Sequence, residues 1–233
     1  MMIEQFTILD QIEIVRSRVI QLRFGVVTLE NGEESGCAWH RGMIRPGDDP
    51  VEMLATIAAD IEAWGYPQPS RGFEMLPTHL VGVVHAPDVI DAWRDARARQ
   101  PVGDNNFQHV SIVDQIVITR SRECRVRFGL VTLKGEREVF NRFNDGHIKP
   151  VDDPVAFITT VRKGLRDRGD PPLTSKSEAL ISAIAGAVHT PDIVSAWESG
   201  AVRWVQRLAA QRREIAGRRP ILSPEDALLV ARV

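Results

Sequence analysis

Two histidines lie close to acids at matching places in the chain, and such pairs can perform acid–base chemistry. His85 is followed by Asp88, and His189 by Asp192. An imidazole within reach of a carboxylate can act as a general base. The alternative is structural, because Thr190-Pro-Asp192 has the residue types of a helix start: a cap, a first-turn proline and an acid at the positive end of the helix dipole. We favour the structural interpretation, in which each histidine hydrogen-bonds locally, since no second convergent group is visible.

Two pairs of adjacent aspartates, Asp48-Asp49 and Asp152-Asp153, are the other candidates for chemistry. Paired carboxylates can bind a cation or act as acid and base. Each pair directly precedes a proline and a helical pattern, so capping of a helix explains one aspartate of each pair. Calcium requires six or more oxygen ligands, and no further acids follow in a loop pattern. We therefore favour capping and predict no metal site.

Six arginines form a repeated basic set on the first two strands expected in each half of the chain. Such a set could bind phosphate or the carboxylates of a partner. The alternative is that these side chains form the solvated face of a sheet or pair with local acids. The set consists of Arg16, Arg18, Arg23, Arg120, Arg122 and Arg127.

The sequence contains no glycine-rich phosphate loop, no Cys/His ligand spacing, no G-x-S-x-G elbow and no H-E-x-x-H motif. We therefore predict no catalytic residue, no cofactor and no enzymatic activity. The net charge of −2 predicts no general attraction to nucleic acid or to anionic membranes. No stretch approaches the ~20 apolar residues that span a bilayer. The N-terminus lacks a basic region and an apolar run, so we expect no signal peptide.

All of these candidates recur at one offset, which sets the organisation of the chain. The segment 10–18 (Asp-Gln-Ile-Glu-Ile-Val-Arg-Ser-Arg) returns as 114–122, an offset of 104 residues that holds without a gap for most of the chain. The two cysteines do not follow it, because Cys37 falls opposite Asn141 and Cys124 opposite Ile20. A duplicated disulfide would have kept both, so we expect a reduced, cytoplasmic origin. We predict a first repeat over 1–99, a linker over 100–106, a second repeat over 107–200 and a helical extension over 201–233.

Each repeat is predicted to be a small α+β unit that opens with a three-stranded antiparallel meander. Alternating apolar residues indicate strands over 7–15 and 19–30, and Asn31-Gly32 is typical of a type I′ hairpin turn. A helix is predicted from Asp49 to about Trp64, and its counterpart from Asp153. Short helical segments are expected over 80–84 and 183–188, and a further helix from residue 87 or 191. The fold class is therefore two tandem α+β units with a long C-terminal helical extension.

The helix expected from residue 191 continues to about residue 216 and carries an apolar stripe at heptad spacing. A helix that outlasts the repeat needs something to cover such a stripe, either its own domain or another chain. We favour association with other subunits, which predicts a homo-oligomer. Arginines on the opposite face leave nucleic acid as a minor option, but the flanking sequence lacks a base-reading motif. The predicted interface residues are Val194, Trp197, Ala201, Trp204, Leu208 and Ile215.

Two further motifs are the segment 39–49 (Trp-His-Arg-Gly-Met-Ile-Arg-Pro-Gly-Asp-Asp) and the segment 84–93 (Val-His-Ala-Pro-Asp-Val-Ile-Asp-Ala-Trp). Both motifs resemble those of a group of short proteins of tailed bacteriophages, and residues 187–197 are an even closer match to the second motif. The second copy lacks the His40-Arg41 pair, because residues 143–147 read Phe-Asn-Asp-Gly-His. The resemblance implies a protein encoded near virion and tail genes, and it brings no catalytic residues with it.

These observations lead to a functional hypothesis. We expect a non-enzymatic virion or tail-associated structural or adaptor protein, made in the bacterial cytoplasm and incorporated in the phage particle, whose partners are other virion or tail proteins. The alternative is a soluble phage accessory protein that inhibits a host defence or transcription factor. An enzyme is the third possibility, and it would require a pocket with convergent polar groups.

Overall fold

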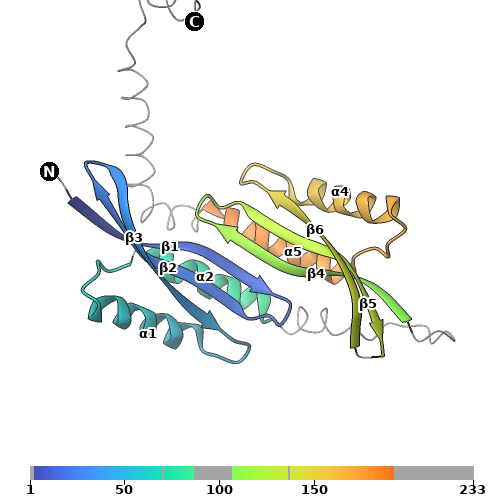
Figure 1. The fold of residues 1–233 in the computed structure, drawn as a ribbon, viewed down its shortest axis with the longest axis horizontal. Helices are drawn as coiled ribbons and strands as arrows, with labels where there is room; N and C mark the ends of the chain where they lie inside the picture. The colour runs from blue at the N-terminus through green and yellow to red at the C-terminus, as the bar shows by residue number, and fades with distance from the viewer. Residues whose placement is uncertain (1–2, 70, 87–106, 136, 192–233) are drawn as a thin grey trace, which may run out of the picture.

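The computed structural model describes residues 3–69, 71–86, 107–135 and 137–191. The chain forms two runs of three strands, each followed by two helices (Figure 1). The first half contains β1 (Ile3–Val15), β2 (Ile20–Glu30), β3 (Glu33–Ile44), α1 (Pro50–Ala63) and α2 (Arg71–Val84). The second half contains β4 (Phe107–Thr119), β5 (Cys124–Lys134), β6 (Arg137–Ile148), α4 (Pro154–Asp167) and α5 (Ser175–His189). The predicted α+β class and the two meanders are confirmed. The linker 100–106 and the extension 201–233 lie outside the described residues.

The two meanders join edge to edge into one antiparallel sheet with the strand order β3-β2-β1-β4-β5-β6. The junction is the pairing of β1 with β4, in which residues 11–15 lie beside residues 115–119. We call this junction, together with the side chains that cross it, the seam. Only the last part of each strand takes part in the seam, and the earlier residues of β1 and β4 extend beyond it. The two halves therefore meet directly through paired strands.

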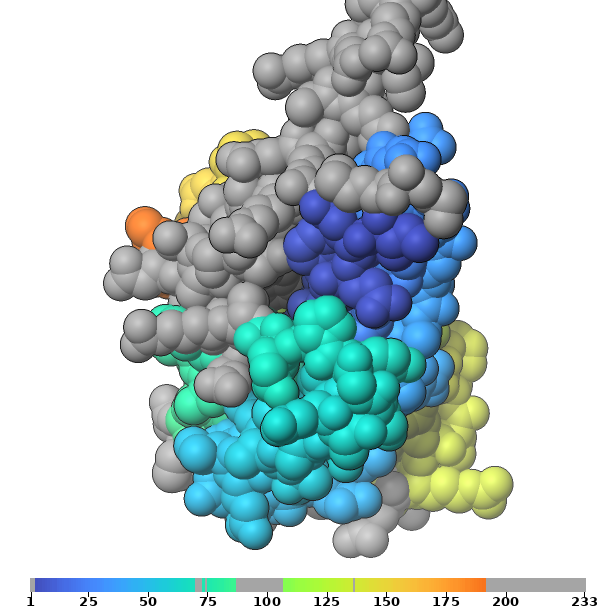
Figure 2. All heavy atoms as spheres, turned by 90° about the vertical axis from the view of Figure 1, so that its left-hand side faces the viewer, coloured from blue at the N-terminus to red at the C-terminus, as the bar shows by residue number. Residues whose placement is uncertain are grey.

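The helices bury one face of this sheet, and the halves share one core beneath them. A single apolar cluster includes Ile12 of β1, Ile118 of β4, Leu76 of α2 and Ile181 of α5, each at most 1% exposed. Helices α2 and α5 contact each other across the boundary between the halves. In Figure 2 the teal atoms that follow α1 lie directly against the dark-blue atoms of β1. No helix within the described ranges is long and apolar enough to cross a membrane.

The second helix of each half is longer than the sequence predicted. The short segments expected over 80–84 and 183–188 are the ends of α2 and α5, which begin at Arg71 and Ser175. Helix α5 starts at a cap in which the Thr174 side chain accepts a hydrogen bond from the Ser177 amide. Helix α2 contains Pro77 in its interior, a residue that usually ends a helix.

The predicted turn and helix starts are confirmed. Asn31 and Gly32 have φ angles of 52° and 87°, and a type I′ turn requires positive φ at both central positions. The side chains of Asp49 and Asp153 accept hydrogen bonds from the amides of Val51 and Val155, and so cap α1 and α4. These local features depend on a few neighbouring residues, which is why they can be predicted from sequence.

A β-bulge in the first strand of each half determines which way the seam residues point. The pairing of β1 with β2 skips Asp10, and the pairing of β4 with β5 skips Asp114 in the same way. An inserted residue reverses the alternation of the strand, so the core side chains change from Leu9 before the bulge to Ile12 after it. The bulged aspartates therefore lie on the face of the sheet away from the helices, which we call the second face.

Glycines at equivalent positions of β2 and β5 allow a close approach of the neighbouring strand. A Cβ atom at Gly25 would lie 1.9 Å from the carbonyl oxygen of Ala38, and one at Gly129 would lie 2.0 Å from that of Arg142. Both distances are far shorter than any van der Waals contact, and the obstructing atoms are backbone. A glycine inside a strand often marks such a site.

We predict that Gly25→Ala and Gly129→Ala each lower the free energy of unfolding by more than about 2 kcal/mol, since strand β3 or β6 must move to admit the new methyl group. Gly36→Ala is the matched control, because nothing lies within 4 Å of a Cβ atom on that strand glycine. Urea unfolding followed by circular dichroism measures all three. Equal midpoints for Gly25→Ala and Gly36→Ala would contradict the close approach.

Candidate functional site

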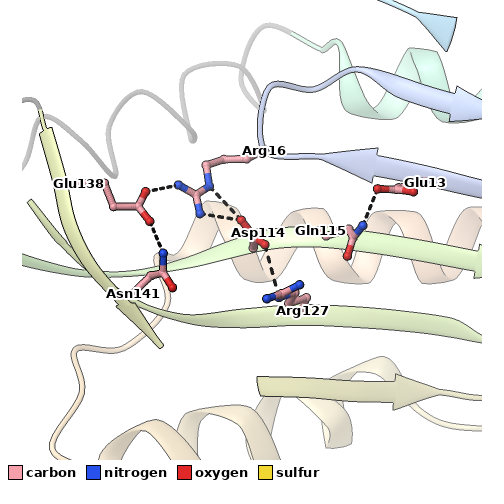
Figure 3. Close-up of polar contacts among 7 residues, drawn as sticks. All are labelled: Glu13, Arg16, Asp114, Gln115, Arg127, Glu138 and Asn141. Carbon is pink, nitrogen blue, oxygen red and sulfur yellow. Dashed lines mark hydrogen bonds and ion pairs between the residues drawn. The ribbon is translucent and has the colours of Figure 1, made fainter. Parts of the chain in front are cut away.

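Two charged clusters lie on the second face at the seam, one in each half. The Asp114 cluster consists of Asp114, Arg16, Arg127, Glu138 and Phe143, and Figure 3 shows its charged members. The Asp10 cluster consists of the residues 104 positions away in each case, namely Asp10, Arg120, Arg23, Glu34 and Trp39. Each cluster thus contains two arginines, two acids and one aromatic ring. In each, one arginine comes from the other half of the chain.

In the Asp114 cluster, Arg16 bridges two acids of the second half (Figure 3). Its Nη2 and Nε lie 2.6 and 3.1 Å from Oδ1 of Asp114, and its Nη1 lies 2.6 Å from Oε2 of Glu138. The Nε of Arg127 approaches the other oxygen of Asp114 at 3.5 Å. Asn141 donates to the remaining oxygen of Glu138 at 2.7 Å. Arg16 follows directly after the last seam residue of β1, so the pairing of the strands places it beside Asp114.

The Asp10 cluster repeats this arrangement from the opposite side of the seam. Nη2 and Nε of Arg120 lie 2.6 and 3.0 Å from Oδ1 of Asp10. The Nε of Arg23 lies 3.2 Å from Oδ2 of Asp10. The contact with the second acid is looser here, because Nη1 of Arg120 lies 3.9 Å from Oε2 of Glu34. Each aspartate therefore receives one arginine from its own half and one from the other half.

The aromatic ring of each cluster lies against both of its guanidinium groups. The Trp39 ring centroid is 4.9 Å from Cζ of Arg23 and 5.5 Å from Cζ of Arg120. Phe143 has the same relation to Arg127 and Arg16, at 5.1 and 5.6 Å. Cation–π contacts at exposed sites contribute about 0.5–1 kcal/mol.

Burial and ion pairing shift the pKa of Arg16 in opposite directions. Burial lowers its pKa, but hydrogen bonds to Glu138 and Asp114 outweigh that effect and hold the pKa above its usual value. The Asp114 side chain is 21% exposed, so removing its partners would leave a carboxylate with little access to water. The ion pairs of the seam are thus more strongly coupled to folding than ordinary surface pairs.

The structure brings four of the six predicted arginines together and separates the other two. Arg16, Arg23, Arg120 and Arg127 converge in pairs on the bulged aspartates. Arg18 and Arg122 lie instead in the turns that follow β1 and β4, each with a φ angle of 64°. Sequence analysis named pairing with acids as one outcome but did not name Asp10 and Asp114, although both begin the repeated segment that contains the arginines.

His85 and His189 each form a hydrogen bond with a residue that lies far away in the sequence of the same half. Nε2 of His85 lies 2.8 Å from the carbonyl oxygen of Arg18, and Nε2 of His189 lies 3.2 Å from that of Arg122. A carbonyl only accepts, so each histidine donates from Nε2. These bonds hold the turns with positive φ against the ends of α2 and α5. The expectation of a structural role is consistent with this geometry, but the predicted local hydrogen bond is wrong. Asp88 and Asp192 lie outside the described residues.

Both aspartates of each acidic pair have backbone partners. Besides the caps described above, Asp48 accepts from the Arg45 amide at 2.7 Å, and Asp152 accepts from the Lys149 amide at 2.8 Å. The described residues contain no group of three or more His, Cys, Asp or Glu side chains arranged to hold a metal ion. Burial raises the pKa of the Cys124 thiol to about 12, so this cysteine stays protonated and unreactive.

The His40-Arg41 segment marks a place where the halves differ. The His40 ring stacks on Trp64 at 3.9 Å between centroids and faces the helices, whereas Arg41 is exposed. In the second half Asn144 replaces His40, and an ion pair between Arg142 and Asp170 at 2.5 Å lies nearby. Nε2 of His40 and Nδ2 of Asn144 are both buried without a hydrogen-bond partner among the described residues. The first half therefore fills this place with aromatic rings and the second half fills it with charges.

The predicted C-terminal interface is not described. Val194, Trp197, Ala201, Trp204, Leu208 and Ile215 all lie beyond residue 191, outside the described residues. No family model, curated protein or solved structure matches the chain.

We predict that Asp10→Asn and Asp114→Asn each lower the free energy of unfolding by about 1–3 kcal/mol, because each leaves two half-buried arginines without their shared carboxylate. Asp60→Asn, on the exposed surface of α1, is the control and should change stability by less than about 0.5 kcal/mol. A double-mutant cycle of Arg16→Gln with Asp114→Asn should give a coupling of about 1 kcal/mol. A coupling near zero would show that this ion pair contributes nothing.

We also predict that His85→Ala and His189→Ala each cost about 1–2 kcal/mol, since the carbonyl oxygens of Arg18 and Arg122 lose their donors. Arg18→Gly should offset part of the loss in the His85→Ala background, because glycine adopts a φ angle of 64° without strain. Thermal unfolding by calorimetry compares the variants. A further loss of stability in the double variant would argue against strain in this turn.

Proposed function

We propose that the protein is a non-enzymatic adaptor that presents two similar surfaces to protein partners, as a structural component of a bacteriophage virion or tail. The observation that supports this most directly is the fusion of two equivalent halves through one sheet and one core. Such a body holds two versions of one surface at a fixed distance and orientation. A protein that links neighbouring subunits of an assembly needs that property.

The use of the polar side chains supports a binding role over catalysis. The arginines of both clusters are satisfied by the bulged aspartates, and the histidines donate to backbone carbonyls. Each paired aspartate accepts from a backbone amide. These candidates thus take part in hydrogen bonds and ion pairs that hold the fold together.

The differences between the halves support partners that are related but not identical. Strands β3 and β6 are the two edges of the sheet, and they carry Arg41 and Asp145 at equivalent, exposed positions. Two residues further along, Met43 is replaced by His147. The arginines and bulged aspartates of the seam are the same in both halves, while these edge residues have opposite charge. An adaptor between two unlike subunits would select for that combination, because charge at a rim sets the choice of partner.

The proposal predicts that purified particles of the phage encoding this chain contain it in a fixed ratio to a tail or capsid protein. Quantitative mass spectrometry of gradient-purified particles measures that ratio, with a non-structural phage protein as the control. Cross-linked peptides from β3 and from β6 should lead to two different virion proteins. Absence from particles, with recovery of the chain on a host protein in infected cells, would favour the accessory-protein alternative.

A further inference from the structure

The backbone pairing at the seam maps onto itself when the two halves are exchanged. Gln11 pairs with Thr119, and replacing each by its counterpart 104 positions away gives the pair Val15 and Gln115, which is also present. The pairs between these two behave in the same way. A contact between unrelated surfaces does not have this property, whereas the two-fold interface of a homodimer always does.

The ion pairs of the seam obey the same exchange. Arg16 with Asp114 becomes Arg120 with Asp10, and the shortest N–O distance is 2.6 Å in both pairs. Each half thus offers an arginine and an aspartate to the other and receives the same two groups in return. Reciprocal pairs of this kind are what a self-complementary interface requires.

The axis that relates the halves passes between Glu13 and Val117. These residues pair with each other and are also each other's counterparts in the repeat. On the helix side the same axis relates α2 to α5, the two helices in contact across the boundary. The complete contact between the halves is therefore a two-layer dimer interface, with paired strands on one side and paired helices on the other.

We propose that the seam is a two-fold dimer interface fused into one chain, and that a second copy of this chain can supply the matching half. The product is a half-exchanged dimer, in which the first half of each chain pairs with the second half of the other. No new contact is required, because both seams of the dimer repeat the seam of the single chain. The inference does not rest on the proposed adaptor role, since it follows from the self-complementarity of the seam.

The residues on the axis determine which halves pair. Two first halves would bring their Glu13 carboxylates opposite each other, and facing like charges in a sheet are unfavourable. In the unlike pairing Glu13 faces Val117 and accepts a hydrogen bond from Gln115 at 2.5 Å. The partner that fits the first half is therefore a second half, from the same chain or from another copy.

Two full-length variants test the exchange by charge complementation. Arg16→Asp in one chain and Asp114→Arg in another each place like charges at the seam of the single chain. In a half-exchanged dimer of the two, the substituted positions meet each other with opposite charges, and the other seam keeps the original pair. Native mass spectrometry of a 1:1 mixture, refolded together, should show about tenfold more of the mixed two-chain species than of either like pair, because two repulsive contacts are relieved at once.

The matched control carries Arg16→Asp and Asp114→Arg in one chain. It contains the same substitution in each half as the two single variants, including the altered contact of position 114 with Arg127. Because both substitutions are in one chain, positions 16 and 114 carry opposite charges within the single chain, and no exchange is needed. We expect it to remain a single chain under the same conditions. Trp204→Ala and Leu208→Ala in every variant remove association through the predicted C-terminal stripe, so failure of that prediction and failure of this one are distinguishable.

Disulfide trapping tests the exchange with the ion pairs intact. Chains with Glu13→Cys and chains with Val117→Cys, both carrying Cys37→Ser, are mixed in denaturant and refolded at increasing concentration. These two residues are directly opposite each other in the seam, so a half-exchanged dimer gives a covalent two-chain product, and its yield rises with concentration. Thr56→Cys on α1, used in place of Val117→Cys, should give none. A mixture that yields no more covalent product than this control, at any concentration, overturns the proposal. The proposal is also overturned if the mixture of Arg16→Asp and Asp114→Arg chains contains single chains alone.

Discussion

The arrangement of the two halves depends on two aspartates whose side chains are too buried for their charge to be stable without ion-pair partners. Asp10 and Asp114 have side chains 15% and 21% exposed, and each is enclosed by an arginine from either half. A carboxylate in such a place is stable only when its charge is compensated. The compensating arginine comes from across the seam, so the halves cannot separate without leaving charges unpaired. The shared core adds the larger apolar contribution, and the ion pairs determine how one half is placed on the other.

The bulges make this arrangement possible. A regular strand would alternate its residues, and a single register could not direct both Leu9 and Ile12 to the core. The extra residue at Asp10 corrects the register and also turns a carboxylate toward the second face, where Trp39 and the arginines lie. One backbone irregularity thus serves the packing of the helix face and the electrostatics of the opposite face. Its repetition at Asp114 shows that the feature belongs to the folding unit and not to one half.

Features that depend on neighbours in the sequence could be predicted, and features that depend on distant contacts could not. The meanders, the Asn31-Gly32 turn and the aspartate caps follow from patterns within a few residues. The repeat gave the number of units but not the pairing of β1 with β4, because either edge of a meander can in principle accept another strand. The bond from His85 to the carbonyl of Arg18 crosses 67 residues and has no local signature. Helix α2 contains Pro77 in its interior, where packing on the core overrides the low helix propensity of proline.

Duplication changes what each half is free to vary. In a homodimer every substitution occurs twice, so a carboxylate on the two-fold axis must face its own copy. Fusion removes that constraint, and the pair of Glu13 with Val117 is a combination that a homodimer of identical halves cannot form. The same freedom explains why Arg41 of β3 is replaced by Asp145 at the equivalent position of β6. It also explains why His40 is replaced by Asn144. The arginines and aspartates of the seam are kept in both halves, because each half must still compensate the charges of the other. Positions that do not take part in this exchange of charges, such as His40 and Asn144, differ between the halves.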